Sequence, residues 1–135
     1  MSPNSDVYFN SPGVATVRWD QSGGIVMVEW EGWADSEEFT ALLEAEIQAL
    51  SDHGASLLLA DCRRQRVLRP ADQDRADREW LPRATAAGLK RFAIVLPTSV
   101  LAAMNLQDRL GKVPSGTLEV GYFDGVKAAQ EWLGR

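Results

Sequence analysis

A short and almost wholly apolar segment, Ser56–Ala60, constrains the fold of this chain more than any other feature. A run of this length without polar alternation is typical of a strand covered on both faces, as in a parallel sheet flanked by helices. Asp61 and a cluster of arginines follow directly, ahead of a predicted helix. Ligands and partners of open α/β sheets bind where strands end next to helix starts, so we expect any functional site here.

The segments ahead of this strand predict a β-hairpin. Val14–Trp19 and Ile25–Trp30 are rich in β-branched and aromatic residues, and the turn residues Asp20–Gly24 join them. This pattern is typical of two antiparallel strands. Val7–Phe9 adds a short strand or arm before the hairpin.

A capping box predicts the start of a long amphipathic helix. Asp35 can cap the helix, and Glu38 stands three residues later, which is the spacing of a capping box. Apolar residues then recur at helical spacing as far as Asp52–Gly54, which predicts a helix with one buried face. These residues are Phe39, Leu42, Leu43, Ile47 and Leu50.

Prolines and a glycine mark the next helical segment. Pro70 can occupy the first turn of a helix in which Ala76 and Trp80 face inward. Pro82 should break or kink that helix, because a proline ring clashes with the preceding turn. Gly88 ends the segment.

The last third of the chain predicts two more strands, each followed by a helix. Phe92–Leu96 is a buried strand, and Pro97–Ser99 begins a helix that stops at Gly111. Leu118–Phe123 is the last strand, and Asp124 caps the final helix. The apolar residues of these helices are Val100, Leu101 and Met104 in the first, and Val126, Ala129, Trp132 and Leu133 in the second.

This order of elements predicts one α/β domain over residues 1–135, with residues 1–6 flexible. Strands that alternate with helices imply a mostly parallel sheet with flanking helices, and the N-terminal hairpin makes that sheet mixed. The single Cys62 and the polar first residues, which do not form a signal peptide, are typical of a cytoplasmic protein. No apolar run is long enough to predict a membrane span.

The formal net charge of −5 is unevenly distributed. Residues 1–62 hold eleven acids and one base, whereas thirteen bases and eight acids follow. An acidic total argues against nucleic-acid binding, which needs a basic field. The asymmetry either orients a partner or a second copy of the chain, or only solvates the exposed faces of the first elements.

Several segments carry a resemblance to a known family. Trp30 and Gly32 precede the acidic helix start Asp35–Glu38, and Leu58–Asp61 ends the central strand. The other matching segments are Lys90–Val95, Gly121–Asp124 and Ala128–Leu133. On these residues the chain, from about Val14 to Leu133, resembles the STAS fold of anti-sigma-factor antagonists and, more closely, the uncharacterised SpoIIAA-like family.

The resemblance implies a regulatory module that binds a protein partner. In STAS antagonists, the phosphorylated Ser or Thr directly follows an Asp at the start of the helix after this strand. Asp61 matches that Asp, but Cys62 stands where the hydroxyl should be. The resemblance therefore implies a scaffold without the usual phosphorylation switch.

The residues after the central strand are candidates for binding an anion or ligand. Arginine presents a planar fork that suits phosphate or carboxylate, and a helix N-terminus adds to that attraction. The alternative is a solvated loop whose arginines pair with Asp72, Asp74 or Asp77. The candidates are Asp61, Cys62, Arg63, Arg64, Arg66 and Arg69.

Catalysis and metal binding have less support in the sequence. Neighbouring arginines would lower the pKa of the Cys62 thiol and favour its thiolate. The one histidine, His53, stands at a helix end, where we expect it to interact with the helix dipole. One Cys and one His fall short of the usual metal ligand sets. We therefore expect no metal, no cofactor and no enzymatic activity.

The tryptophans leave two functions open. Most of the five should lie in the core, because large aromatic residues dominate buried area. Trp33, in a loop, and Trp80, near Pro82, either line a groove for an apolar ligand or simply pack. One hypothesis is therefore a STAS-like module that binds a protein partner or itself as a homo-oligomer. The other is a carrier of a small amphipathic, lipid-like or anionic ligand.

Overall fold

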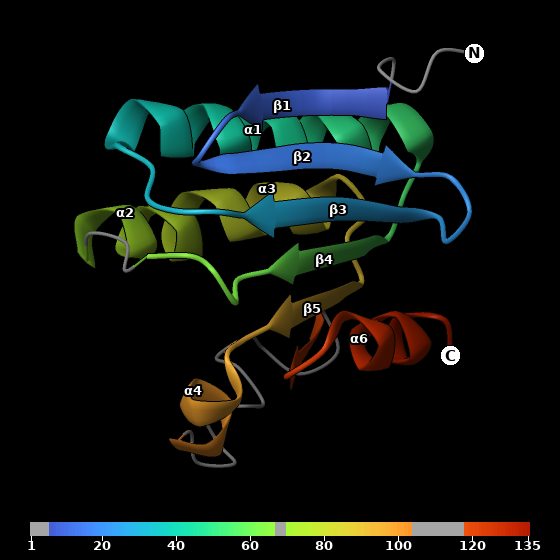
Figure 1. The fold of residues 1–135 in the computed structure, drawn as a ribbon. Coiled ribbons are helices and arrows are strands. Elements are labelled where there is room, and N and C mark those ends of the chain that lie inside the picture. Colours follow the sequence, from blue (N-terminus) through green and yellow to red (C-terminus); the bar gives the residue numbers. More distant parts are fainter. Residues whose placement is uncertain (1–5, 67–69, 104–117) are drawn as a thin grey trace.

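Six strands form one mixed sheet in which spatial order follows sequence order (Figure 1). The computed structural model describes residues 6–66, 70–103 and 118–135, without the side chains of Pro70, Gln73 and Asp77. The first two strand pairs are antiparallel and the other three are parallel, which confirms a mostly parallel sheet with an N-terminal hairpin. The strands are β1 (Val7–Ser11), β2 (Ala15–Asp20), β3 (Ile25–Trp30), β4 (Leu57–Asp61), β5 (Arg91–Val95) and β6 (Glu119–Phe123).

Helices cover both faces of the sheet. The layer of α1, α2 and α3 lies against one face, and α6 lies against the other beside β5 and β6 (Figure 1). Within the described residues, no helix is long and apolar enough to cross a membrane. The helices are α1 (Ser36–His53), α2 (Pro70–Arg75), the π-helix η2 (Ala76–Trp80), α3 (Leu81–Ala86), α4 (Thr98–Ala103) and α6 (Val126–Leu133).

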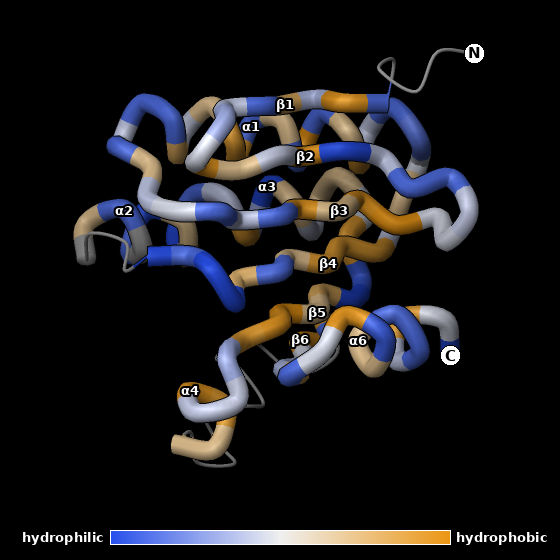
Figure 2. The backbone as a smooth tube through the Cα atoms, viewed as in Figure 1, coloured by the Kyte–Doolittle hydropathy of each residue, from blue (hydrophilic) through white to orange (hydrophobic). Residues whose placement is uncertain are grey.

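Strand β4 has a buried core on each side, as its apolar run predicts. Leu58 and Ala60 pack in the larger core, under α1 and α3, whereas Leu59 packs in the smaller core, under α6. Alternate side chains of a strand point to opposite faces, so only an uninterrupted apolar run suits this position. The hydropathy colours show the same apolar band through the middle of the sheet (Figure 2).

The predicted capping box forms at the start of α1. The Glu38 backbone N–H donates to Asp35 Oδ1 at 2.8 Å, and the Asp35 backbone N–H donates to Glu38 Oε1 at 3.2 Å. Gly54 ends the helix with φ +57°, in the left-handed region that favours glycine. The helix therefore starts and stops where the local pattern predicts.

Pro82 was predicted to break or kink its helix. The helix does not break there, but its α-helical hydrogen bonding gives way to a π-helical turn just before the proline. Trp80 and Leu81 keep right-handed helical backbone angles, and the Leu81 N–H bonds to Ala76 O in a π-helical turn. This wider turn gives the proline ring room against the preceding carbonyls, so the helix continues. Ala76 and Trp80 are buried, as predicted.

The two later helices differ from prediction in detail. Gly125 is the N-cap of α6 and makes no side-chain hydrogen bond, so the prediction that Asp124 caps this helix is wrong by one residue. Helix α4 contains no buried residue within its described span, and Val100 is 46 % exposed. Met104, Gly111 and residues 1–5 lie outside the described residues.

Candidate functional site

Two loops meet at the edge of the sheet where β3 and β4 end. We call them the Trp33 loop (residues 31–35) and the arginine loop (residues 62–66). The Arg66 backbone N–H donates to Gly32 O at 3.0 Å, which joins the two loops directly. This contact places the exposed Trp33 next to the arginine loop, as parallel β3 and β4 predict.

Gly32 holds the Trp33 loop against the turn between β1 and β2. The backbone N–H groups of Glu31 and Gly32 donate to Val14 O at 2.8 Å and 3.2 Å. A Cβ atom on Gly32 would lie 2.5 Å from Gly13 O, so only glycine fits without a shift. The backbone of this loop is therefore fixed before any partner arrives.

Asp61 and Arg63 form a two-point ion pair at the start of the arginine loop. Arg63 Nε donates to Asp61 Oδ1 at 2.9 Å, and Nη2 donates to Oδ2 at 2.8 Å. The Arg63 backbone N–H also donates to Oδ1, at 3.2 Å. These hydrogen bonds lower the pKa of Asp61 against the opposing effect of its partial burial. The carboxylate is therefore held in its charged form.

The other predicted arginines are placed differently. Arg64 and Arg66 are exposed, and neither side chain makes a hydrogen bond or ion pair with another described residue. Arg69 lies outside the described residues.

The sequence left open a solvated loop whose arginines pair with Asp72, Asp74 or Asp77, and the structure describes the side chains of the first two acids. Asp72 pairs with Arg75, and Asp74 pairs with Arg78, so neither acid binds the arginine loop. The side chain of Asp77 is not among those described.

Cys62 lies in surroundings opposite to those expected of a reactive thiol. Burial, followed by the charges of Asp61 and Glu46, raises its pKa to about 12. The expected lowering by arginines is wrong, because Arg63 is engaged by Asp61 while the sulfur packs against the larger core. His53 ends α1, which returns the chain to the opposite edge of the sheet, so Cys62 and His53 do not form a catalytic pair (Figure 1).

The three residues predicted to line an apolar groove differ in their surroundings. Trp33 is 38 % exposed in its loop, Trp80 is buried, and Pro82 is exposed. Trp80 lines a cavity of about 70 Å³ between α1 and the α2–α3 segment, and neither Trp33 nor Pro82 lines it. A pocket for a drug-sized ligand needs about 300–1,000 Å³. The other lining residues are Thr40, Leu43, Glu44, Arg75, Glu79 and Arg83.

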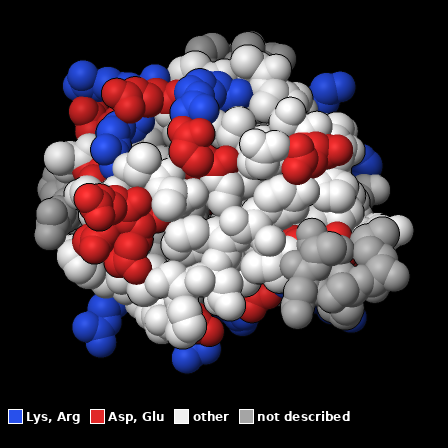
Figure 3. Space-filling model, turned by 90° about the horizontal axis from the view of Figure 1, so that it is seen from above, with Lys and Arg blue, Asp and Glu red and all other residues white. Residues whose placement is uncertain are grey.

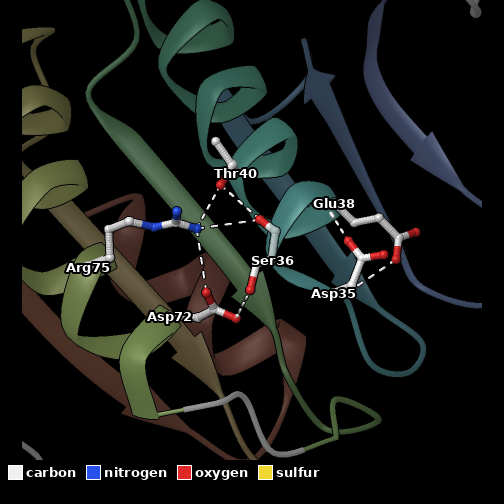
Figure 4. Close-up of polar contacts among 6 residues, drawn as sticks. All are labelled: Asp35, Ser36, Glu38, Thr40, Asp72 and Arg75. Atoms are coloured by element: carbon white, nitrogen blue, oxygen red, sulfur yellow. Dashed lines mark hydrogen bonds and ion pairs between the residues drawn. The ribbon is translucent and has the colours of Figure 1, made fainter.

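A polar network around the buried Asp72 lies where α1 and α2 begin, and the sequence did not predict it. Ser36 Oγ, at the start of α1, donates to Asp72 Oδ2 at 3.1 Å, and Asp72 is only 4 % exposed (Figure 4). Arg75 donates to Thr40 Oγ1 at 2.6 Å and lies 3.5 Å from Asp72 Oδ1. The network ties the start of α2 to the start of α1. Its partners are 36 residues apart in sequence, so no local pattern marks it.

Glu46 is a second residue that sequence reasoning missed. It is 5 % exposed on the buried face of α1, and burial raises its pKa well above the usual range. Its spacing of four from both Leu42 and Leu50 places it on the apolar stripe, which is a readable signal. No group of three or more His, Cys, Asp or Glu residues in the described ranges could hold a metal ion.

Acidic side chains do not form one continuous surface field on the face seen from above. They gather there in several separate clusters, with basic side chains beside some of them (Figure 3). Arg18 on β2 pairs with Glu29 on β3 at 3.3 Å, which shows such local compensation. Of the two roles considered for the acids, this distribution favours the second on that side of the molecule: they solvate the exposed faces of the elements.

The sheet order and its helical layers define a SpoIIAA-like fold. The chain is similar to a crystal structure of an uncharacterised protein of the DUF3478 family from Shewanella loihica PV-4, which has a SpoIIAA-like fold. That likeness has a TM-score of 0.56 and 19 % sequence identity, and it covers 93 % of this chain and 97 % of the other. No family model matches the chain, and no curated protein matches it. The likeness confirms the expected fold.

Proposed function

We propose that this chain is a non-enzymatic, STAS-like module that binds a protein partner through the Trp33 loop and the arginine loop. One observation carries the proposal: the exposed Trp33, Arg64 and Arg66 stand on two loops that a backbone hydrogen bond joins. Tryptophan and arginine are the residue types that most often dominate binding energy at protein interfaces.

The contacts that hold the Trp33 loop and the adjoining helix start suit a binding surface. Gly32 fixes one loop against a neighbouring turn, and the Ser36–Asp72 contact holds the helix starts together. Loops fixed in advance lose little conformational entropy when a partner binds. The setting we propose is cytoplasmic, where a lone thiol such as Cys62 stays reduced.

A photo-cross-linker placed at position 33 tests the proposal. We expect it to capture a protein partner or a second copy of the chain, and sedimentation of the purified protein distinguishes the two. The Trp33→Ala/Arg64→Ala/Arg66→Ala variant should then bind the purified partner at least about tenfold more weakly.

The control for this experiment is Arg18→Ala, which removes an exposed arginine from the hairpin. It should bind the partner as the unchanged protein does. Equal affinity for the triple variant and the unchanged protein would refute the proposed surface.

A further inference from the structure

The Arg63 guanidinium already holds a carboxylate in the arrangement that an acidic partner would use. Two N–H groups of Arg63 contact the two oxygens of Asp61 at 2.9 Å and 2.8 Å. This is the two-point geometry in which arginine recognises carboxylates. The Arg63 side chain remains 45 % exposed, so the pair lies within reach of a partner.

Arg64 also interacts electrostatically with the Asp61 carboxylate. The positive charge of Arg64 contributes to lowering the pKa of Asp61, after the larger effect of Arg63. Arg64 and Arg66 are themselves exposed and unpaired with any other described side chain. The loop therefore presents two available guanidinium groups beside a third that is occupied.

Most acids near the two loops are engaged elsewhere. Glu31 accepts the Gly13 backbone N–H at 3.0 Å, and Asp35 and Glu38 accept from each other's backbone N–H groups in the capping box. Glu37, in the first turn of α1, is exposed. Asp61 is thus the acid that competes directly for an arginine of the loop.

We infer that the partner presents an acidic segment to the arginine loop, and that Asp61 is an internal competitor that withholds Arg63 from it. This inference rests on the proposed function and adds the chemistry of the partner. Binding by the unchanged protein draws on Arg64 and Arg66. When the charge of Asp61 is removed, Arg63 becomes a third guanidinium for the partner's carboxylates.

A double-mutant cycle with a fluorescent hexaglutamate peptide tests the inference by anisotropy. Asp61→Asn should tighten binding about three- to tenfold, because it frees one arginine for a charge-assisted contact. Arg63→Ala alone should change affinity little. Asp61→Asn/Arg63→Ala should return to the affinity of the unchanged protein. Added salt should weaken every complex, because salt screens the exposed charges.

A matched control separates the freed arginine from a simple loss of negative charge. Glu37→Gln removes one exposed acid near the loops but frees no arginine, so it should leave affinity nearly unchanged. An unchanged thermal melt and circular dichroism spectrum establish that each variant is folded.

The inference is overturned if Asp61→Asn binds no tighter than the unchanged protein. It is also overturned if Asp61→Asn/Arg63→Ala keeps the full gain, because repulsion alone would then explain it. Stronger competition by inorganic phosphate than by the peptide would overturn the choice of an acidic protein segment. Equal peptide binding by Arg64→Ala/Arg66→Ala and the unchanged protein would count against the proposed surface, whatever the coupling between residues 61 and 63.

Discussion

Trp19 and His53 lie face to face, with ring centroids 4.1 Å apart and ring planes within 4° of parallel. The Tyr8 hydroxyl lies 3.0 Å from His53 Nε2 and donates to Asp52 Oδ2 at 3.0 Å. Tyr8 belongs to β1 and Trp19 to β2, whereas Asp52 and His53 end α1. The four side chains therefore fasten the edge strand to the helical layer.

Tyr8→Phe should lower the free energy of unfolding by about 0.5–1 kcal/mol, because it removes an exposed hydrogen-bonding hydroxyl. Burial and the bond to Asp52 raise the pKa of Tyr8 from 10.0 to about 12. The protonated phenol therefore stabilises the fold fully below pH 10, and this stability is lost as the pH rises through 12. Urea unfolding at pH 9 and pH 11.5 should show this loss in the unchanged protein and not in the variant. Thr16→Val, which removes only a 3.4 Å bond, is the control.

Glu46→Leu should raise the free energy of unfolding at pH 7 by about 1–3 kcal/mol, because it replaces a buried acid in an apolar setting. The pKa of Glu46 is raised in the folded state, so its protonated form is favoured there. Below the ordinary pKa of a glutamate, the carboxyl is protonated in both the folded and the unfolded state, so its ionisation does not affect stability. Above that pKa the unfolded state loses the proton first, and the free energy of unfolding falls as the pH rises. Thermal melts at pH 4 and pH 7 should therefore show the larger gain at pH 7. An equal or smaller gain at pH 7 would contradict this account.

Asp72→Ala should lower the free energy of unfolding by about 1–3 kcal/mol, because it leaves Ser36 and Arg75 without their shared carboxylate. Asp74→Ala is a matched control in the same helix, since Asp74 is 57 % exposed and makes one surface pair. That change should cost less than about 0.5 kcal/mol. Urea unfolding of both variants provides the comparison, and equal losses would contradict the role given to Asp72.

Cys62 should react slowly with iodoacetamide in the folded protein at pH 8. Only the thiolate reacts, and a pKa of about 12 leaves very little thiolate at this pH. Unfolding in urea should bring the thiol to its ordinary reactivity and increase the rate by at least about tenfold. Mass spectrometry follows the alkylation, and equal rates in both states would show that the sulfur is not shielded.

Features encoded by neighbouring residues could be predicted from sequence. The bounds of β3, Ile25–Trp30, match the predicted strand, because its β-branched residues are followed by a clear change in composition. The capping box of Asp35 and Glu38 depends on residues three positions apart. The edge of the sheet that carries the candidate site follows from the parallel strands alone.

Features that depend on distant residues could not be predicted in this way. The Ser36–Asp72 bond joins residues whose proximity only the packed helices create. The surroundings of the two tryptophans also depend on distant residues: Trp33 and Trp80 are both large aromatics, but one belongs to a loop and the other is packed beneath α1. The state of Cys62 depended on burial, which the neighbouring arginines in the sequence concealed.

The sequential strand order has a consequence for how this protein is made. Each described strand after β1 pairs with the strand before it in the chain, so none must be inserted between two that are already paired. During synthesis the hairpin of β1 and β2 can form first and serve as a template for β3, then β4, β5 and β6. Such growth from one end keeps loop-closure costs low and suits folding as the chain leaves the ribosome.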